Sequence, residues 1–83
     1  MKNVLVYSSN TCGYCVLAKR LLAKHGITPQ EINIDLDPAQ RVEMTQRTGR
    51  RTVPQIFIGE HHVGGFDDLV AIERSGELAA LMQ

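Results

Sequence analysis

The feature that most constrains this chain is the run Thr11-Cys12-Gly13-Tyr14-Cys15, which holds its only two cysteines. An apolar segment, Val4–Tyr7, precedes the run, and a helix-like segment, Val16–His25, follows it. A Cys-x-x-Cys pair between a strand and a helix is typical of a thiol–disulfide site. The sequence therefore predicts a redox motif at the carboxyl end of the first strand, where open α/β sheets place their sites.

The two cysteines are expected to differ in role. Cys12 would lie at the start of the helix, where unpaired backbone N–H groups and the helix dipole favour an anion, and the thiolate is the form that attacks disulfides. Cys15 follows one turn later on the same face, so its sulfur can reach back to that of Cys12. We therefore predict Cys12 as the nucleophile and Cys15 as the resolving thiol.

Two other interpretations of the cysteines are weaker. A pair of unreactive buried cysteines has no need of this spacing. A structural zinc site needs about four ligands, and the only other soft ligands are three histidines. Adjacent His61 and His62 in a strand would point to opposite faces, which disfavours a closed tetrahedral site.

Size and charge limit the function classes. The 83 residues predict one domain, 1–83. Nine basic residues balance nine acidic ones, so nothing draws the chain as a whole to nucleic acid or to an anionic membrane. Two cysteines are too few for a secreted disulfide scaffold, and no leader or long apolar run is evident. We expect a soluble protein of a reducing compartment, the cytoplasm.

The periodicity of apolar residues predicts the order β-α-β-α-β-β-α. A strand–helix–strand connection is right-handed and makes its two strands parallel, whereas a two-residue link that begins with glycine, Gly59-Glu60, suits a type II′ hairpin. The expected fold class is α/β, with a four-stranded mixed sheet flanked by helices on both faces. Strands are expected at 3–7, 31–35, 53–58 and 61–63, and the three helices of this order at 14–24, 37–48 and 67–74. A short final helix is expected after them, near 78–82.

Local signals set the ends of the two middle helices. Asp37 is a suitable N-cap before Pro38, and Gly49 would end that helix. Its thin apolar stripe is assigned to Val42, with Met44 and Thr45 as further candidates, so one side of the helix is expected to be exposed. The following helix would be capped by Asp67 or Asp68.

Three stretches together resemble the glutaredoxin family, whose members have the thioredoxin fold. They are Cys12-Gly13-Tyr14-Cys15, Thr52-Val53-Pro54 and Gly64-Gly65-Phe66-Asp67-Asp68, and the resemblance extends over essentially the whole chain. It implies a glutathione-dependent thiol–disulfide oxidoreductase, with glutathione as co-substrate and with protein disulfides and glutathionylated proteins as partners. It also implies a monomer, unless a cluster bridges two chains.

The resemblance also implies how glutathione is held. Val53 would offer its backbone to the cysteinyl residue, beside a cis Pro54 that faces the cysteines. Arg41 matches a position that holds the glycine carboxylate. The N–H groups of Phe66 and Asp67 would bind the γ-glutamyl carboxylate, the Asp68 side chain would bind its ammonium, and Tyr14 would flank the groove. The expected glutathione-binding residues are Tyr14, Arg41, Thr52, Val53, Pro54, Gly65, Phe66, Asp67 and Asp68.

Simpler interpretations remain for some of these residues. Arg41 could be a solvated helix residue, and Gly64-Gly65 could be only a turn. Arg47, Arg50 and Arg51 are interpreted as solvated, with a wider basic rim of the groove as the alternative.

The chain departs from the common family pattern at two positions. Gly13 stands where many relatives have proline, and Ser9 stands where many have lysine. The first departure leaves open a [2Fe–2S] cluster with Cys12 as a ligand, carried by a dimer. A further alternative is a redoxin that is served by thioredoxin reductase.

Overall fold

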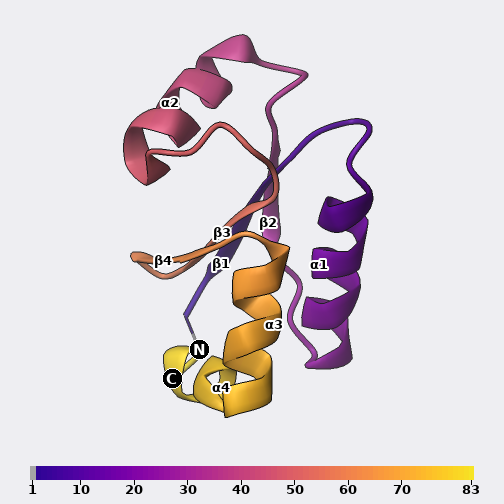
Figure 1. Ribbon diagram of the computed structural model, residues 1–83, viewed down its shortest axis with the longest axis vertical. Coiled ribbons are helices and arrows are strands. Elements are labelled where there is room, and N and C mark those ends of the chain that lie inside the picture. The colour runs from indigo at the N-terminus through magenta and orange to yellow at the C-terminus, as the bar shows by residue number, and fades with distance from the viewer. Residues whose placement is uncertain (1) are drawn as a thin grey trace.

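The computed structural model describes residues 2–83 and contains a four-stranded mixed sheet. Its strands are β1 (Val4–Ser8), β2 (Gln30–Asn33), β3 (Gln55–Ile58) and β4 (His61–Gly64). In the order β2-β1-β3-β4, β1 pairs in parallel with β2, and β3 is antiparallel to both of its neighbours (Figure 1). The predicted strand order along the chain and the mixed sheet are confirmed.

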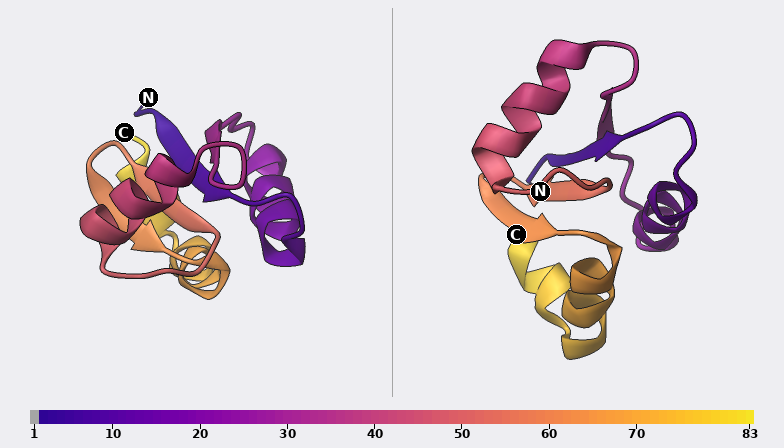
Figure 2. Two further views of the ribbon diagram at one scale, coloured as in Figure 1. Left: turned by 90° about the horizontal axis from the view of Figure 1, so that it is seen from above. Right: turned by 45° about the horizontal axis from the view of Figure 1, so that its top comes forward.

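Helices cover both faces of this sheet. They are α1 (Gly13–Lys24), α2 (Pro38–Thr48), α3 (Phe66–Ser75) and α4 (Glu77–Leu81). Figures 1 and 2 show α2 apart from the other three helices, which lie on the opposite side of the sheet. Within residues 2–83, no helix is long and apolar enough to cross a membrane.

Each face has its own apolar cluster, because successive residues of a strand point to opposite sides. Val6 of β1 and Ile56 of β3 pack with α1, α3 and α4. Tyr7 and Phe57, their chain neighbours, pack with Met44 of α2. Strands that are buried on both faces need continuous apolar runs, and Val4–Tyr7 of β1 and Ile56–Ile58 of β3 supply them.

The caps of α2 are as predicted, but the face that it buries is not. Asp37 Oδ1 accepts a hydrogen bond from the Ala39 N–H at 3.1 Å, and Gly49 ends the helix with a φ of 72°. Val42 is 57% exposed, whereas Met44 is completely buried. Residues two apart in a helix lie about 200° apart around its axis, so burying Met44 turns Val42 to solvent. The assignment of Val42 to the apolar stripe was wrong.

The start of α3 also differs from the prediction. The N-cap is Gly65, and Asp68 reaches back from the third helical position to accept the Gly65 N–H at 2.9 Å. The preceding Gly64 has a φ of +117°, and a Cβ there would overlap the Asp68 carboxylate. Neither aspartate is therefore the N-cap, although the Asp68 carboxylate accepts the N-cap N–H as the acidic residue of a capping box does.

The β3–β4 hairpin is as expected. Gly59 has a φ of 59°. No non-glycine residue among 2–83 has a positive φ, so the φ of Glu60 is negative. That combination fits a type II′ turn and excludes type I′.

Candidate active site

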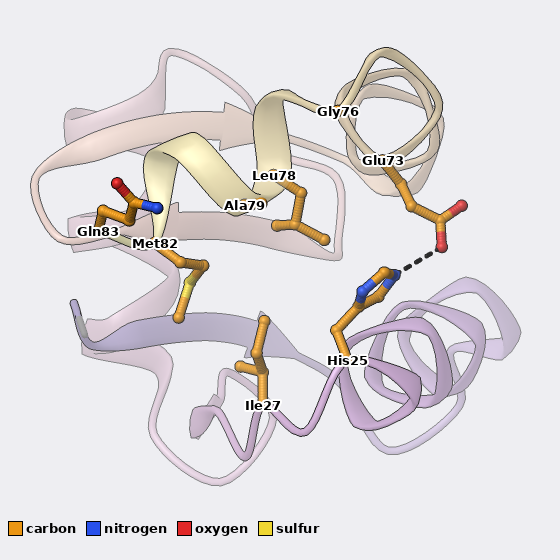
Figure 3. A pocket seen from close by; sticks show the side chains of 8 residues that line it. All are labelled: His25, Ile27, Glu73, Gly76, Leu78, Ala79, Met82 and Gln83. Atoms are coloured by element: carbon orange, nitrogen blue, oxygen red, sulfur yellow. Dashed lines mark hydrogen bonds and ion pairs between the residues drawn. The ribbon is translucent and has the colours of Figure 1, made fainter.

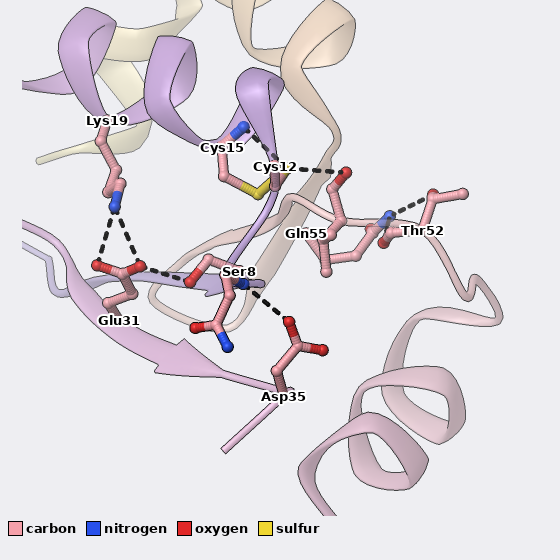
Figure 4. Close-up of a disulfide and its surroundings, with 10 residues drawn as sticks. Ser8, Cys12, Cys15, Lys19, Glu31, Asp35, Thr52 and Gln55 are labelled. Carbon is pink, nitrogen blue, oxygen red and sulfur yellow. Dashed lines mark hydrogen bonds and ion pairs between the residues drawn. A yellow bond between two sulfur atoms is a disulfide. The ribbon is translucent and has the colours of Figure 1, made fainter. Parts of the chain in front are cut away.

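The two cysteines lie where β1 passes into α1, and they form a disulfide with their Cα atoms 5.2 Å apart (Figure 4). Cys12 is the N-cap of α1, with extended φ and ψ of −132° and 100°. Its Sγ accepts a hydrogen bond from the Cys15 N–H at 3.1 Å. The sulfur that would carry the negative charge therefore already faces a backbone donor at the positive end of a helix.

Accessibility separates the two sulfurs. Cys15 is 2% exposed, whereas Cys12 is only half-buried. A disulfide in solution can thus approach Cys12 and not Cys15. This supports the predicted order of attack.

The loop before β3 passes directly beside Cys12. The Val53–Pro54 peptide bond is cis, as the family resemblance implied, and Pro54 is buried. The Val53 carbonyl oxygen lies 3.7 Å from Cys12 Sγ. In the disulfide this is a contact, since the sulfur carries no proton, and in the dithiol the S–H could donate to that oxygen.

A groove of about 260 Å³ opens between this loop and the start of α3. The ring of Tyr14 stacks on Phe66, with ring centroids 5.9 Å apart, and closes one side. Eight of the residues expected to bind glutathione line the groove. They are Tyr14, Thr52, Val53, Pro54, Gly65, Phe66, Asp67 and Asp68.

Arg50 also lines the groove, which agrees with the alternative that it widens the basic rim and not with its interpretation as a solvated residue. Its Nη1 lies 3.1 Å from Asp68 Oδ2. The Gly65 N–H and then the Arg50 guanidinium lower the pKa of the Asp68 carboxyl below its usual value. The only sequence signal for Arg50 was its place two residues before Thr52.

Arg41 does not line the groove. Its Nη1 donates to the Arg51 carbonyl oxygen at 3.2 Å. It borders a separate hollow together with Val42, Thr45, Gln46 and Arg51. The structure thus separates this one predicted residue from the others.

A buried amide fixes the loop from behind, and sequence reasoning missed it. Gln55 is completely buried in β3, and its Nε2 donates to the Thr52 carbonyl oxygen at 3.0 Å. Its Oε1 accepts from Nε2 of His62 on β4 at 2.7 Å. Burial, and then Arg50, lower the pKa of His62, which favours the neutral form of the ring. A polar residue within an apolar strand was the available signal.

A polar cluster around the carboxylate of Glu31 lies on the other side of the disulfide. Lys19 Nζ is 3.1 Å from Glu31 Oε2, and the Ser8 hydroxyl donates to the same carboxylate (Figure 4). The Ser8 hydrogen bond and then Lys19 lower the pKa of Glu31. The positive charge of Lys19 is therefore committed to Glu31.

A larger hollow, of about 400 Å³, lies far from the cysteines, beside the C-terminal end of α1 (Figure 3). Two of its polar members, His25 and Glu73, form a hydrogen bond at 2.8 Å, and the third is Gln83. By helical rise it is roughly 18 Å from the N-terminal end of α1. The hollow therefore has no part in the cysteine chemistry.

The fold, the paired cysteines and the cis-proline loop beside them define a thiol–disulfide oxidoreductase of the thioredoxin fold. The family model described as Glutaredoxin matches residues 4–63. The chain is 50% identical to a glutaredoxin of Pseudomonas aeruginosa over 82 residues, which cover 99% of this chain and 98% of that protein. The chain belongs to the glutaredoxin family.

Two solved structures are also similar. A buckwheat glutaredoxin–glutathione complex superposes with a TM-score of 0.90 at 36% identity, covering 98% of this chain and 76% of that one. A structure concerned with the metal binding of glutaredoxins gives a TM-score of 0.76 at 49% identity, covering 99% and 89%.

Proposed function

We propose that this protein is a glutathione-dependent oxidoreductase that reduces glutathione mixed disulfides and protein disulfides in a reducing compartment, the cytoplasm. The observation that carries the proposal is the groove beside Cys12, which is lined by Tyr14, by the Thr52–Pro54 loop and by the start of α3. The buckwheat relative, which was solved with glutathione, supports the choice of ligand.

On a glutathione mixed disulfide, only Cys12 is needed. Its thiolate attacks the glutathione sulfur, the disulfide bond breaks, and the protein thiolate leaves and takes a proton. Cys12 is then bonded to glutathione. A second glutathione thiolate attacks that glutathione sulfur, which releases glutathione disulfide and regenerates the Cys12 thiolate. The net reaction consumes one glutathione thiol: the protein sulfur is reduced to a thiol, the attacking glutathione sulfur is oxidised, and the sulfur of the first glutathione stays in a disulfide throughout.

On a protein disulfide, both cysteines act. The Cys12 thiolate attacks one sulfur, and the Cys15 thiolate then attacks Cys12 Sγ and releases the reduced protein. The product is the internal Cys12–Cys15 disulfide, which two glutathione molecules reduce. The burial of Cys15 restricts its attack to the sulfur of its own neighbour.

The groove offers a partner for each part of glutathione. The exposed backbone of Val53 would pair with the cysteinyl residue as a short added strand. The N–H groups of Phe66 and Asp67 at the start of α3 would face the γ-glutamyl carboxylate, and the Asp68 side chain would face the ammonium. Arg41 borders a separate hollow, so it would reach the glycine carboxylate only after its side chain moved toward the groove.

Mass spectrometry after exposure to glutathione disulfide tests the proposal. We expect one glutathione adduct on Cys12 that converts to the internal disulfide. We also expect steady turnover when glutathione and glutathione reductase supply electrons. Turnover with thioredoxin reductase alone, without glutathione, would instead assign the protein to the alternative redoxin class.

Gly13 favours a second candidate function, the carriage of a [2Fe–2S] cluster. A Cβ built at Gly13 meets no atom within 4 Å, so the surface beside Cys12 is open to a second chain. Within residues 2–83, no three His, Cys, Asp or Glu side chains gather to hold a metal ion, so one chain cannot supply four ligands. The half-buried Cys12 of each of two chains, with one glutathione thiolate on each, fits that number.

A further inference from the structure

The ion pair between Arg50 and Asp68 joins two different parts of the groove. Arg50 belongs to the loop between α2 and β3, and Asp68 belongs to the first turn of α3. Asp68 is the fixed member, because the Gly65 N–H holds its Oδ2 and the absence of a Cβ at Gly64 leaves space for the carboxylate. Arg50 reaches across to that same oxygen at 3.1 Å.

Both members of the pair can still bind a ligand. The hydrogen bonds from Gly65 and Arg50 end on Oδ2, and none of the hydrogen bonds found within residues 2–83 involves Oδ1 of Asp68. A guanidinium has five N–H donors in a planar fork, and the bond to Asp68 uses one nitrogen. The two side chains are 49% and 46% exposed, so a ligand in the groove can reach them without separating them.

A cation and an anion held side by side complement one particular chemical group, the head of an α-amino acid. That group carries an ammonium and a carboxylate on one carbon atom. It can lie against the ion pair so that its carboxylate faces the guanidinium of Arg50 and its ammonium faces the carboxylate of Asp68. The γ-glutamyl residue of glutathione ends in such a head, whereas cysteinylglycine has none on that side of its cysteine.

We propose that Arg50 is a specificity-determining residue of the groove, which with Asp68 recognises the zwitterionic α-amino-acid end of the γ-glutamyl group. Arg50 binds the carboxylate together with the N–H groups of Phe66 and Asp67, and Asp68 binds the ammonium. The inference rests on the proposed use of glutathione and adds a residue and a selectivity to it. Arginine suits the position better than lysine, because its fork matches the two oxygens of a carboxylate.

Two substrates and three variants test the inference. The substrates are the mixed disulfides of 2-mercaptoethanol with glutathione and with cysteinylglycine. The variants are Arg50→Gln, Arg50→Lys and the control Arg74→Gln, which removes the same charge from the last turn of α3. Thermal unfolding of each variant verifies that the fold is retained.

Arg50→Gln should raise KM for the glutathione substrate about tenfold with kcat unchanged, a loss expected for one half-exposed charge-assisted hydrogen bond. Its kinetics on the cysteinylglycine substrate should stay within about twofold, because that substrate offers Arg50 no carboxylate to bind. Arg50→Lys should recover part of the loss, and Arg74→Gln should match the wild type on both substrates.

Three results would overturn the inference. An equal rise of KM for both substrates would mean that Arg50 attracts substrates only through its positive charge and does not recognise the γ-glutamyl group. A lower KM for the glutathione substrate in Arg50→Gln would mean that Arg50 competes with the ligand for Asp68. Unchanged kinetics would make the ion pair a surface contact. A wild-type protein that cannot use the glutathione substrate would instead refute the proposed function itself, before any variant is compared.

Discussion

The backbone N–H of Cys15 donates a hydrogen bond to the sulfur of Cys12, 3.1 Å away, so the redox motif caps its own helix. Helix N-caps are usually serine, threonine, aspartate or asparagine, whose oxygen accepts from the same backbone position. Here a sulfur does so, and a negative charge on it would gain both the hydrogen bond and the helix dipole. The pair is also unequal, because the donor residue is buried and the acceptor is not.

The first prediction is that substitution of Cys12 and substitution of Cys15 remove different activities. Cys12→Ser should abolish all exchange, because serine offers no thiolate. Cys15→Ser should keep turnover of small glutathione mixed disulfides and lose the reduction of protein disulfides, because only the second route needs a resolving thiol. Steady-state assays on the two substrate classes measure this. Equal losses in both variants would contradict the assigned roles, and both variants should fold, since serine at position 12 can still cap α1.

How far the sequence predicts this molecule can be judged from particular residues. The cysteine motif, the hairpin at Gly59-Glu60 and the caps Asp37 and Gly49 were correct, because each depends on a local backbone requirement that one or two residue types meet. The assignment of Val42 to the buried face was wrong, whereas Met44, the further candidate, is buried, because the rotation of α2 about its axis is set by the sheet beneath it.

The polar contacts behind and across the groove were not predictable for a related reason. Arg50 meets Asp68 across 18 positions of the chain, and Gln55 meets His62 on the neighbouring strand. Such contacts depend on strand register and on loop path, which the residue types do not specify, so the sequence signals could mark Gln55 and Arg50 as unusual but could not name their partners. The contact with Asp68 therefore could not be assigned to Arg50 rather than to Arg51 beside it.

The second prediction concerns the buried amide. Gln55→Glu keeps the shape but replaces the N–H donors, so at pH 7 a carboxylate oxygen would face the Thr52 carbonyl oxygen. The free energy of unfolding should fall by about 1–3 kcal/mol, the cost of an unmade buried hydrogen bond. The loss should shrink at lower pH, because burial raises the pKa of the new carboxyl and its protonated form can donate again. Urea unfolding at pH 7 and pH 5 measures both effects.

The control for that variant is Gln46→Glu, which adds the same charge on the exposed side of α2. It should change the free energy of unfolding by less than about 0.5 kcal/mol. If Gln55→Glu behaved like this control, the bond to Thr52 would have no part in holding the loop.

The third prediction is a pH dependence that centres on Glu31. Ser8 and then Lys19 lower the pKa of this carboxyl from 4.5, so the folded protein favours its charged form. The stability that this contributes is complete above the unfolded-state pKa and is lost as pH falls through the folded-state pKa. Glu31→Gln should therefore be less stable than the wild type at pH 7, by about 0.2–1 kcal/mol for a pair this exposed.

Unfolding measured between pH 7 and pH 3 should show the two proteins converging below about pH 4.5. Glu43→Gln on α2 removes the same charge from an exposed position and is the matched control. A constant difference between wild type and Glu31→Gln over that range would show that the charge of Glu31 is not what stabilises the contact.

The fourth prediction is that Arg41 contributes little to glutathione use. Its guanidinium is exposed and is held by the Arg51 carbonyl outside the groove. Arg41→Ala should raise KM for glutathione substrates by less than about fivefold, the equivalent of an exposed contact worth under about 1 kcal/mol. A loss as large as that expected for Arg50→Gln would mean that Arg41 moves into the groove when the ligand binds.

The last prediction concerns Gly13 and a bridging [2Fe–2S] cluster. Gly13 is the first residue of α1, a position where proline is well tolerated because its missing N–H would have no partner in the helix. Gly13→Pro should therefore fold and retain thiol exchange. Its ring would fill the open space beside Cys12, where a second chain must approach, and proline would lack the backbone N–H that lies near the cluster.

Reconstitution with iron, sulfide and glutathione should give a coloured dimer for the wild type and a colourless monomer for Gly13→Pro, as judged by visible absorbance and by mass in solution. If the wild type stayed colourless and monomeric with glutathione present throughout, the cluster would be ruled out, and Gly13 would be left as a modifier of the redox poise of the two cysteines.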